Sequence, residues 1–105
     1  MPELDEIIHQ PVRLRLMAAL VAIKSGEGAE FTFLRDLLNV TDGNLGAHLR
    51  RLEEAGYIES TKSFVDRKPH TYVAATAAGR KVFRNQVAAL EEIIQGAASG
   101  MKAKR

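Results

Sequence analysis

The sequence contains no cysteine, so disulfide frameworks, thiolate chemistry and cysteine-bound zinc are all excluded. It also lacks any apolar run that approaches the ~20 residues needed to span a bilayer. The opening residues, MPELDEII, are acidic and lack the basic region with which a signal peptide begins. We therefore expect a cytoplasmic protein with no membrane partner.

The composition is typical of one folded domain, which we expect to span residues 1–105. A hydrophobic content of 46% is enough to build a core, and a charged content of 27% is ordinary for a globular protein. The net charge of +2 is too modest to indicate a nucleic-acid partner by itself.

The first third of the chain predicts two helices. Apolar residues at steps of three and four indicate an amphipathic helix over about 11–24, with a short lead-in before Pro11. The segment SGEGAE at 25–30 is a loop, and FTF at 31–33 is a candidate for a very short strand. Thr32 would then cap a short second helix. The apolar residues of that helix are Leu34, Leu37 and Leu38.

The middle of the chain carries clear start and stop signals for a third helix. NVT at 39–41 breaks the preceding helix, and Thr41 is a capping residue for the next. Gly56 stands where a helix commonly ends in a left-handed residue. The expected apolar face consists of Leu45, Leu49, Leu52 and Ala55.

The last part of the chain predicts a hairpin and a long helix. Two segments rich in β-forming residues, 57–65 and 70–75, are separated by a turn, DRKP, at 66–69. Thr76 would cap a helix over about 77–96. The tail at 97–105 is small and basic, and we expect it to fray.

The order of these elements is helix, short strand, helix, tight turn, helix, hairpin, helix. Two helices joined by a three-residue turn and followed by a β-hairpin form a winged helix-turn-helix. The predicted fold class is therefore α+β, mainly α, with the long C-terminal helix available for dimerisation.

Three segments resemble bacterial and archaeal repressors of the ArsR/MarR type. HQPVRLRLMAAL is similar to their first helix, and TDGNLGAHLRRLEEAGYIE to their recognition helix. KSFVDRKPHTYVAATAAGRKVF is similar to their wing and to the T-x-x-G-R opening of their last helix. The resemblance covers roughly residues 4–94 and is strongest to a compact winged-helix subgroup with the pattern T-D-G-N-L-x-x-H-L-x-x-L-E-x-A-G-Y. This chain departs from it at Gly46, where serine is common, and at Ala75, where leucine usually precedes the threonine.

The predicted recognition helix begins with small residues on its outward face, although glycine there costs roughly 0.5–1 kcal/mol relative to alanine. Small residues let the backbone enter a major groove only ~12 Å wide, where Asn44 could pair with adenine and Arg50 with guanine. The wing supplies basic side chains for phosphate or minor-groove contact. The predicted DNA-binding residues are Thr41, Asp42, Gly43, Asn44, Gly46, Ala47, Arg50, Arg51, Lys62, Arg67 and Lys68.

Charge along the chain favours the wing as the basic element. Residues 62–84 carry Lys62, Arg67, Lys68, Arg80, Lys81 and Arg84 against Asp66 alone. The recognition segment 42–59 is net negative, and Asp42 suits the helix dipole but not a nearby phosphate. We therefore expect moderate rather than very tight nonspecific binding.

The long C-terminal helix carries an apolar seam with the alternating spacing of a coiled coil. Val82 and Ile93 lie beside the seam and are expected to pack on the helix's own domain. The first helix is the expected second part of the interface. The predicted dimerisation residues are Leu4, Ile7, Ile8, Phe83, Val87, Leu90 and Ile94, and the seam continues through Ala97 and Met101.

Enzymatic signals are weak. The three histidines His9, His48 and His70 lack the spacing of a helical metal site, and we expect His48 to be a packing or hydrogen-bonding residue. No serine or threonine belongs to a pattern typical of a nucleophile. We predict no enzyme, no metal and no cofactor.

The predicted function is a homodimeric transcriptional regulator, a repressor, that binds a pseudo-palindromic operator in double-stranded DNA. Two alternatives stay open: a winged-helix module for protein–protein contact in a larger assembly, and a nonspecific architectural DNA-binding protein. The chain offers no separate sensor domain, so any small-molecule effector would have to bind in the dimer interface.

Overall fold

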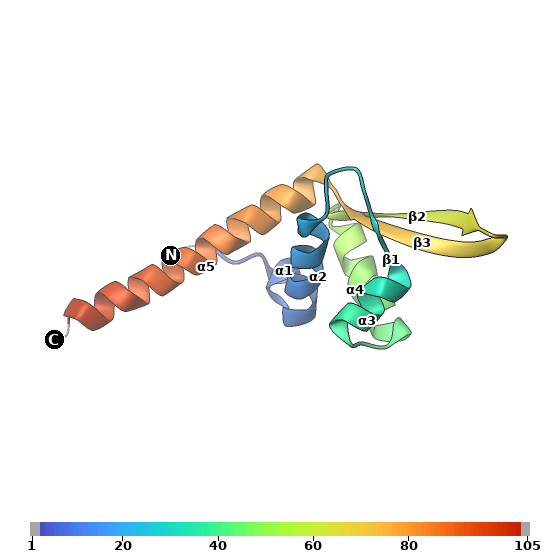
Figure 1. Cartoon of the computed structure of the whole chain (residues 1–105). Helices are drawn as coiled ribbons and strands as arrows, with labels where there is room; N and C mark the ends of the chain where they lie inside the picture. The colour runs from blue at the N-terminus through green and yellow to red at the C-terminus, as the bar shows by residue number, and fades with distance from the viewer. Residues whose placement is uncertain (1–2, 104–105) are drawn as a thin grey trace.

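The computed structural model describes residues 3–103 and confirms the mainly helical α+β fold with a winged helix-turn-helix (Figure 1). The sheet is antiparallel and has the strand order β1-β3-β2. The elements are α1 (Glu6–His9), α2 (Pro11–Ala22), β1 (Ala29–Glu30), α3 (Phe31–Leu38), α4 (Asp42–Glu54), β2 (Ile58–Val65), β3 (Lys68–Ala75) and α5 (Ala77–Ala103).

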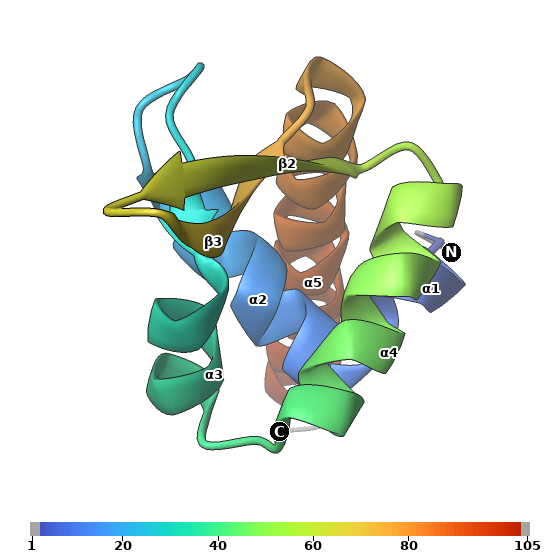
Figure 2. The ribbon, with the colours of Figure 1, turned by 90° about the vertical axis from the view of Figure 1, so that its right-hand side faces the viewer.

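The core lies where the inner part of the sheet meets α2, α3 and α4, seen end-on in Figure 2. Each helix contributes leucines at the spacing that places them on one face. The fully buried side chains include Ile8, Leu16, Met17, Leu20, Leu34, Leu45, Leu52, Ile58 and Val73. The wing, β2 and β3, and the distal part of α5 leave this core in opposite directions (Figure 1).

The predicted lead-in before Pro11 is a short helix, α1. The Oδ1 atom of Asp5 caps it by accepting hydrogen bonds from the backbone N–H groups of Ile7 and Ile8, at 2.9 and 3.0 Å. Gln10 caps α2 in the same way, and Pro11 occupies the first helical position, where its missing N–H is not needed.

The boundary between β1 and α3 differs from the prediction. The strand is Ala29–Glu30 rather than 31–33, and α3 already begins at Phe31. Glu30 takes the capping position without a side-chain bond, so the predicted cap at Thr32 is wrong. Phe31 packs partly against the core, and this burial accounts for a helix that starts two residues before the capping signal.

The hairpin turn is also shorter than predicted. It consists of Asp66 and Arg67 alone, both with positive φ (51° and 68°), while Lys68 and Pro69 belong to β3. Two left-handed residues in a two-residue loop form a type I′ turn, whose twist matches that of the flanking strands. Pro69 is tolerated because β1 pairs with β3 only at Tyr72 and Val73, which leaves this stretch of β3 as an edge.

The T-x-x-G-R segment locks the start of α5 to the base of the wing. The hydroxyl of Thr76 donates to the carbonyl of Gly56 (2.6 Å) and accepts from the N–H of Gly79 (3.0 Å), which confirms Thr76 as the cap. A Cβ at Gly79 would lie 2.0 Å from the carbonyl oxygen of Tyr57, so only glycine fits. Arg80 donates to the carbonyls of Val21 and Ile23 at the end of α2.

The last helix is longer than predicted. It continues to Ala103 rather than ending near residue 96, while residues 104–105 of the predicted tail lie outside the described part of the chain. Every described side chain of α5 from residue 91 to residue 101 is exposed. The radius of gyration is 16.4 Å, against about 13 Å for a compact domain of this length, because α5 and the wing extend the molecule.

Candidate nucleic-acid interface

Helix α4 divides into a buried leucine face and an exposed polar face, as its sequence predicts. Leu45, Leu49 and Leu52 are buried against the core, and Gly46 is half-buried. The exposed face carries the remaining predicted contact residues of this helix: Asp42, Gly43, Asn44, Ala47, Arg50 and Arg51. This face begins at the helix N-terminus, where Asp42 contacts Arg35 of α3, and its other residues are exposed.

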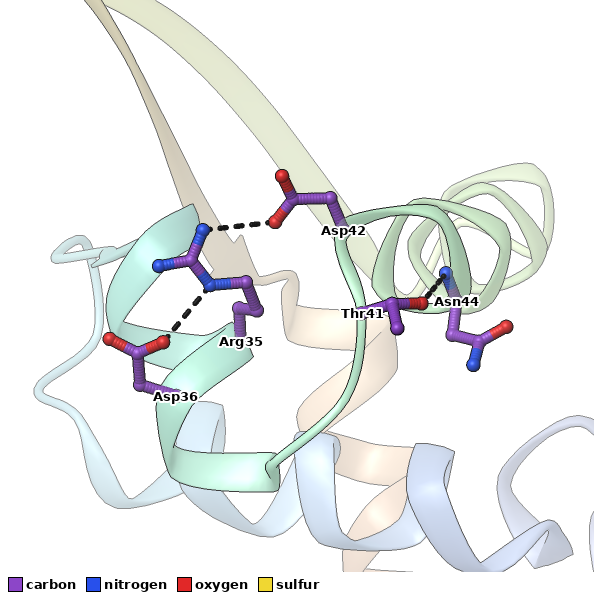
Figure 3. Close-up of polar contacts among 5 residues, drawn as sticks. All are labelled: Arg35, Asp36, Thr41, Asp42 and Asn44. Atoms are coloured by element: carbon purple, nitrogen blue, oxygen red, sulfur yellow. Dashed lines mark hydrogen bonds and ion pairs between the residues drawn. The ribbon is translucent and has the colours of Figure 1, made fainter.

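The N-terminus of α4 is fixed by its cap. The Oγ1 atom of Thr41 accepts a hydrogen bond from the backbone N–H of Asn44 at 3.1 Å, which confirms the predicted cap. The amide side chain of Asn44 points away from Thr41 and from the neighbouring α3 (Figure 3). Thr41 is thus used by the helix itself, while the Asn44 side chain is presented outward.

Arg35 of α3, which no sequence pattern singles out, joins the two helices of the motif. Its Nη1 atom lies 3.0 Å from Oδ1 of Asp42, and its Nε atom lies 3.0 Å from Oδ1 of Asp36 (Figure 3). These two carboxylates raise the pKa of Arg35. Because the pair offsets the negative charge of Asp42, the unfavourable carboxylate at the head of α4 is less repulsive to a phosphate than the sequence indicates.

The two glycines of α4 are not required by the fold. Neither has a positive φ, and a Cβ at Gly43 would meet nothing within 4 Å. A Cβ at Gly46 would meet only the Nη1 atom of Arg50, at 3.9 Å. Arg50 therefore reaches back along the helix toward its N-terminus, the end that enters a groove.

The wing presents its basic residues at and near the tip. Lys62, Arg67 and Lys68 are all exposed, and every residue of β2 after Ile58 is exposed as well. Arg67 is held in the left-handed region, a conformation that costs roughly 1–2 kcal/mol for a residue with a side chain. The tip therefore keeps an arginine where glycine would be more stable.

Arg80 does not belong to this basic surface. Its guanidinium is bound to the carbonyls at the C-terminal end of α2, at 3.1 Å from Val21 and 2.8 Å from Ile23. A cation is favourable there because the carbonyl groups at a helix end are otherwise unsatisfied. The charge of the wing region available to a partner is therefore smaller than the sequence count.

A polar contact behind α4 connects it to α2. Arg13 binds the carbonyl of Ile7, and its Nη1 atom lies 3.2 Å from Nδ1 of His48. Burial, and then the charge of Arg13, lower the pKa of His48 below its ordinary value. A neutral His48 accepts from Arg13, so the predicted hydrogen-bonding role of this histidine is confirmed.

The described part of the chain holds no cluster of metal-binding side chains. Residues 3–103 contain no group of three or more His, Asp or Glu side chains that could hold a metal ion. A shallow cavity of about 230 Å³ lies between the start of α3 and β3, beside a contact of His70 with Glu30. Among the described helices, none combines the length and the apolar character that crossing a membrane requires.

The predicted dimerisation residues divide into buried and exposed groups. Ile8 is fully buried in the protomer's own core, so its prediction as an interface residue is wrong for this conformation. Phe83 also packs against that core, as Val82 does, whereas Leu4, Ile7 and Leu90 are half-buried. Val87 and Ile94 are exposed, and so is Ile93, which was expected to pack on its own domain.

Comparison with known proteins identifies this architecture. The family model described as a winged helix DNA-binding domain matches residues 12–94. A transcriptional regulator homologue from Pyrococcus horikoshii has a similar structure, with a TM-score of 0.80 and 32% identity over 89% of each chain. The chain belongs to the winged-helix family of DNA-binding transcriptional regulators. The predicted resemblance to winged helix-turn-helix transcriptional regulators is thereby confirmed, and this family is a non-enzymatic one, as predicted.

Two further relatives extend the comparison. The uncharacterized protein MJ0432 of Methanocaldococcus jannaschii is 38% identical over 82 residues, which are 78% of this chain and 86% of that protein. MepR of Staphylococcus aureus, in a complex with DNA, matches with a TM-score of 0.71 and 20% identity over 95% of this chain and 81% of that one. At this identity the MepR likeness shows the fold alone.

Proposed function

We propose that this winged-helix regulator is a repressor that binds a pseudo-palindromic operator as a homodimer. Helix α4 enters the major groove by its N-terminus, and the wing contacts the backbone and the minor groove beside it. A repressor bound at the promoter prevents RNA polymerase from binding there. We expect it to act in the cytoplasm, as the sequence predicts.

The observation that carries the proposal is the exposed face of α4. Gly43 and Gly46 lower the stability of the helix relative to alanine. The fold does not require them, because an added Cβ would meet nothing at Gly43 and only the end of the Arg50 side chain at Gly46. Since nothing inside the protomer requires glycine at these positions, the loss of helix stability is explained if a partner must approach the backbone closely. The outward amide of Asn44 and the guanidinium of Arg50 lie on the same helix and can pair with base edges.

Dimerisation is supported by the distal part of α5. A helix of 27 residues spans about 40 Å, and its side chains from residue 91 to residue 101 are all exposed. Ile94 and Met101 are 65% and 73% exposed on the seam, which is unfavourable unless a partner covers them. A two-fold pair of α5 helices would set two recognition helices one DNA turn apart, about 34 Å, or a multiple of it.

Selection of bound duplexes from a random pool tests the proposal. A two-fold symmetric motif is the expected result, and a salt titration on the selected and a random duplex should give a large specificity ratio. Equal affinity for both duplexes would make the protein a nonspecific architectural binder. No binding to any duplex would favour the alternative of a protein–protein module.

A further inference from the structure

The wing carries a large exposed aromatic side chain that the contacts described so far do not use. Phe64 is 74% exposed near the end of β2, two residues before the turn. An isolated β-hairpin gains nothing by exposing phenylalanine, and solvent-facing positions of a wing need only polar or β-branched residues. The position is therefore a candidate contact site.

The strand register defines the face of the wing on which Phe64 lies. Ile58 and Val73, both buried against the helices, share a face of the sheet because side chains alternate along a strand. Phe64 lies six residues from Ile58 and therefore on that same face, which continues past the helices toward the tip. Figure 1 shows that α3 and α4 lie on this side of the sheet, so this face of the wing and the recognition helix are on the same side of the molecule.

The neighbours of Phe64 on this face form a small apolar tip with a basic border. Pro69 is directly opposite Phe64 on β3. Lys62 lies two residues before Phe64 on β2 and therefore on the same face. Opposite residues have Cβ atoms about 4.5–5.5 Å apart, so Phe64 and Pro69 present one apolar surface. Lys62 borders it on this face and Arg67 borders it at the turn, while Lys68, opposite Val65, adds its charge from the other face of the tip. Asp66 is the single acidic residue of the tip.

We propose that Phe64, backed by Pro69, is an apolar wedge that enters the DNA minor groove beside the recognition helix. This inference rests on the proposed function. An apolar side chain bordered by cations matches a groove whose walls are deoxyribose and whose rims are phosphates, and phenylalanine is among the side chains that partly unstack base steps from the minor groove. A basic border fits neither an apolar protein groove nor a second copy of this basic tip.

The test uses the full-length protein and the duplex that it selects from a random pool, with 2-aminopurine placed in turn at the steps outside each half-site. The wild-type protein should raise the fluorescence at one step, because an inserted ring reduces stacking. Phe64→Ala should abolish that rise and lower the affinity about tenfold, which corresponds to about 1.4 kcal/mol. Phe64→Leu should keep much of both effects, since leucine also serves as a wedge.

Val65→Ala is the matched control, because Val65 is the next residue on the opposite face of β2 and is also exposed. It should leave fluorescence and affinity unchanged. Thermal unfolding should show that all variants fold, as expected for exposed positions. If Phe64→Ala binds like the wild type, or if Val65→Ala loses as much affinity, the wedge is refuted while the proposed function stands.

Two other outcomes would also overturn the inference. If Phe64→Ala changes the sedimentation of the free protein, the tip is a contact between copies of the chain. If the wild-type protein selects no duplex at all, the proposed function fails and the wedge fails with it. Both proposals are supported if the wild-type protein selects a duplex and Phe64→Ala loses the fluorescence rise together with about tenfold in affinity.

Discussion

At the scale of single residues, the head of α4 combines a local cost with an outward-facing chemistry. Gly43 lies in open space, Asn44 points away from its capping partner, and Arg50 reaches back over Gly46. Asp42 is paired with Arg35. Together these residues let a partner approach the backbone at the N-terminal end of α4, where side-chain hydrogen-bond donors and an acceptor are exposed.

Arg50→Ala should weaken binding to the selected operator by about 1–3 kcal/mol, because a bidentate arginine–guanine contact contributes about this much discrimination. One position of the operator should become degenerate. Titration of the operator and of a set of single-base variants measures both effects. Arg15→Ala, which removes an exposed arginine from α2, should leave the affinity unchanged. A folded Arg50→Ala protein with the original affinity would contradict base contact by Arg50.

Gly43→Ala separates the stability of the helix from its function. The added Cβ meets nothing in the protomer, so the free energy of unfolding should increase by up to about 1 kcal/mol. Operator affinity should decrease, since the methyl group holds the backbone away from the groove. Gly96→Ala on α5 is also open to a Cβ and should stabilise the protein without loss of affinity. A Gly43→Ala protein that binds DNA normally would leave this glycine unexplained.

At the scale of elements, helix and hairpin positions were predictable where the signal is local. Thr41, Gly56 and Thr76 mark their boundaries by capping or by positive φ, and the structure confirms all three. The start of α3 was missed because tertiary packing of Phe31 outweighs the capping preference of Thr32.

Contacts between distant residues were not predictable. Arg35 with Asp42, Gly79 against Tyr57, and Arg80 at the end of α2 each join separate elements. A single sequence contains no period or spacing that pairs such residues. The burial of Ile8 belongs to the same class, because a short amphipathic helix does not reveal which surface will cover it.

The wing as an element should act mainly through charge. Replacing Arg67 and Lys68 with alanine should weaken binding to all duplexes similarly and reduce the log–log salt slope by up to about two units. Fluorescence anisotropy at several salt concentrations measures the slope. Lys81→Ala with Arg84→Ala removes the same charge from exposed positions of α5 and should leave the slope unchanged. An unaltered slope in the wing variant would mean that the wing does not touch DNA.

The contact between α2 and α4 should make stability dependent on pH. The pKa of His48 is lowered in the folded protein, first by burial and then by Arg13, so the unfolded chain takes up the proton first. Its contribution is present above the ordinary pKa of about 6.5 and is lost as the pH falls toward the lowered pKa. Urea unfolding between about pH 7.5 and pH 5 should therefore show a smaller decrease for His48→Gln than for the wild type. Identical curves would contradict this assignment.

At the scale of the whole molecule, α5 and the wing project from opposite ends of the core, and the longest dimension is 65 Å. In the proposed function, one end contacts DNA and the other pairs with a second copy of the chain. Between them, Asp5 connects the two: its backbone N–H donates to Oε1 of Gln86 on α5 (2.8 Å), and its Oδ2 atom accepts from the hydroxyl of Tyr57 (2.8 Å).

Leu90→Glu with Ile94→Glu places four charges in the proposed dimer interface. Sedimentation should show a monomer that keeps most of its helical circular dichroism, and operator binding should collapse because one module buries little surface. Ala88→Glu with Ser99→Glu adds the same charge to exposed positions on the other side of α5 and should leave the dimer intact. A wild-type protein that sediments as a monomer at micromolar concentration would refute the dimer.

The close approach of Gly79 to Tyr57 restricts which changes in the length of α5 the protein can tolerate. Because the start of α5 is fixed against the base of the wing, the helix and the DNA-binding core rotate as one body. A single residue inserted after Glu92 would turn the distal seam by about 100° and misalign the two half-sites. Removing seven residues would nearly preserve the orientation of the seam relative to the core. It would shorten the helix of each protomer by about 10 Å. Insertions and deletions in α5 should therefore be tolerated in whole heptads and rejected otherwise.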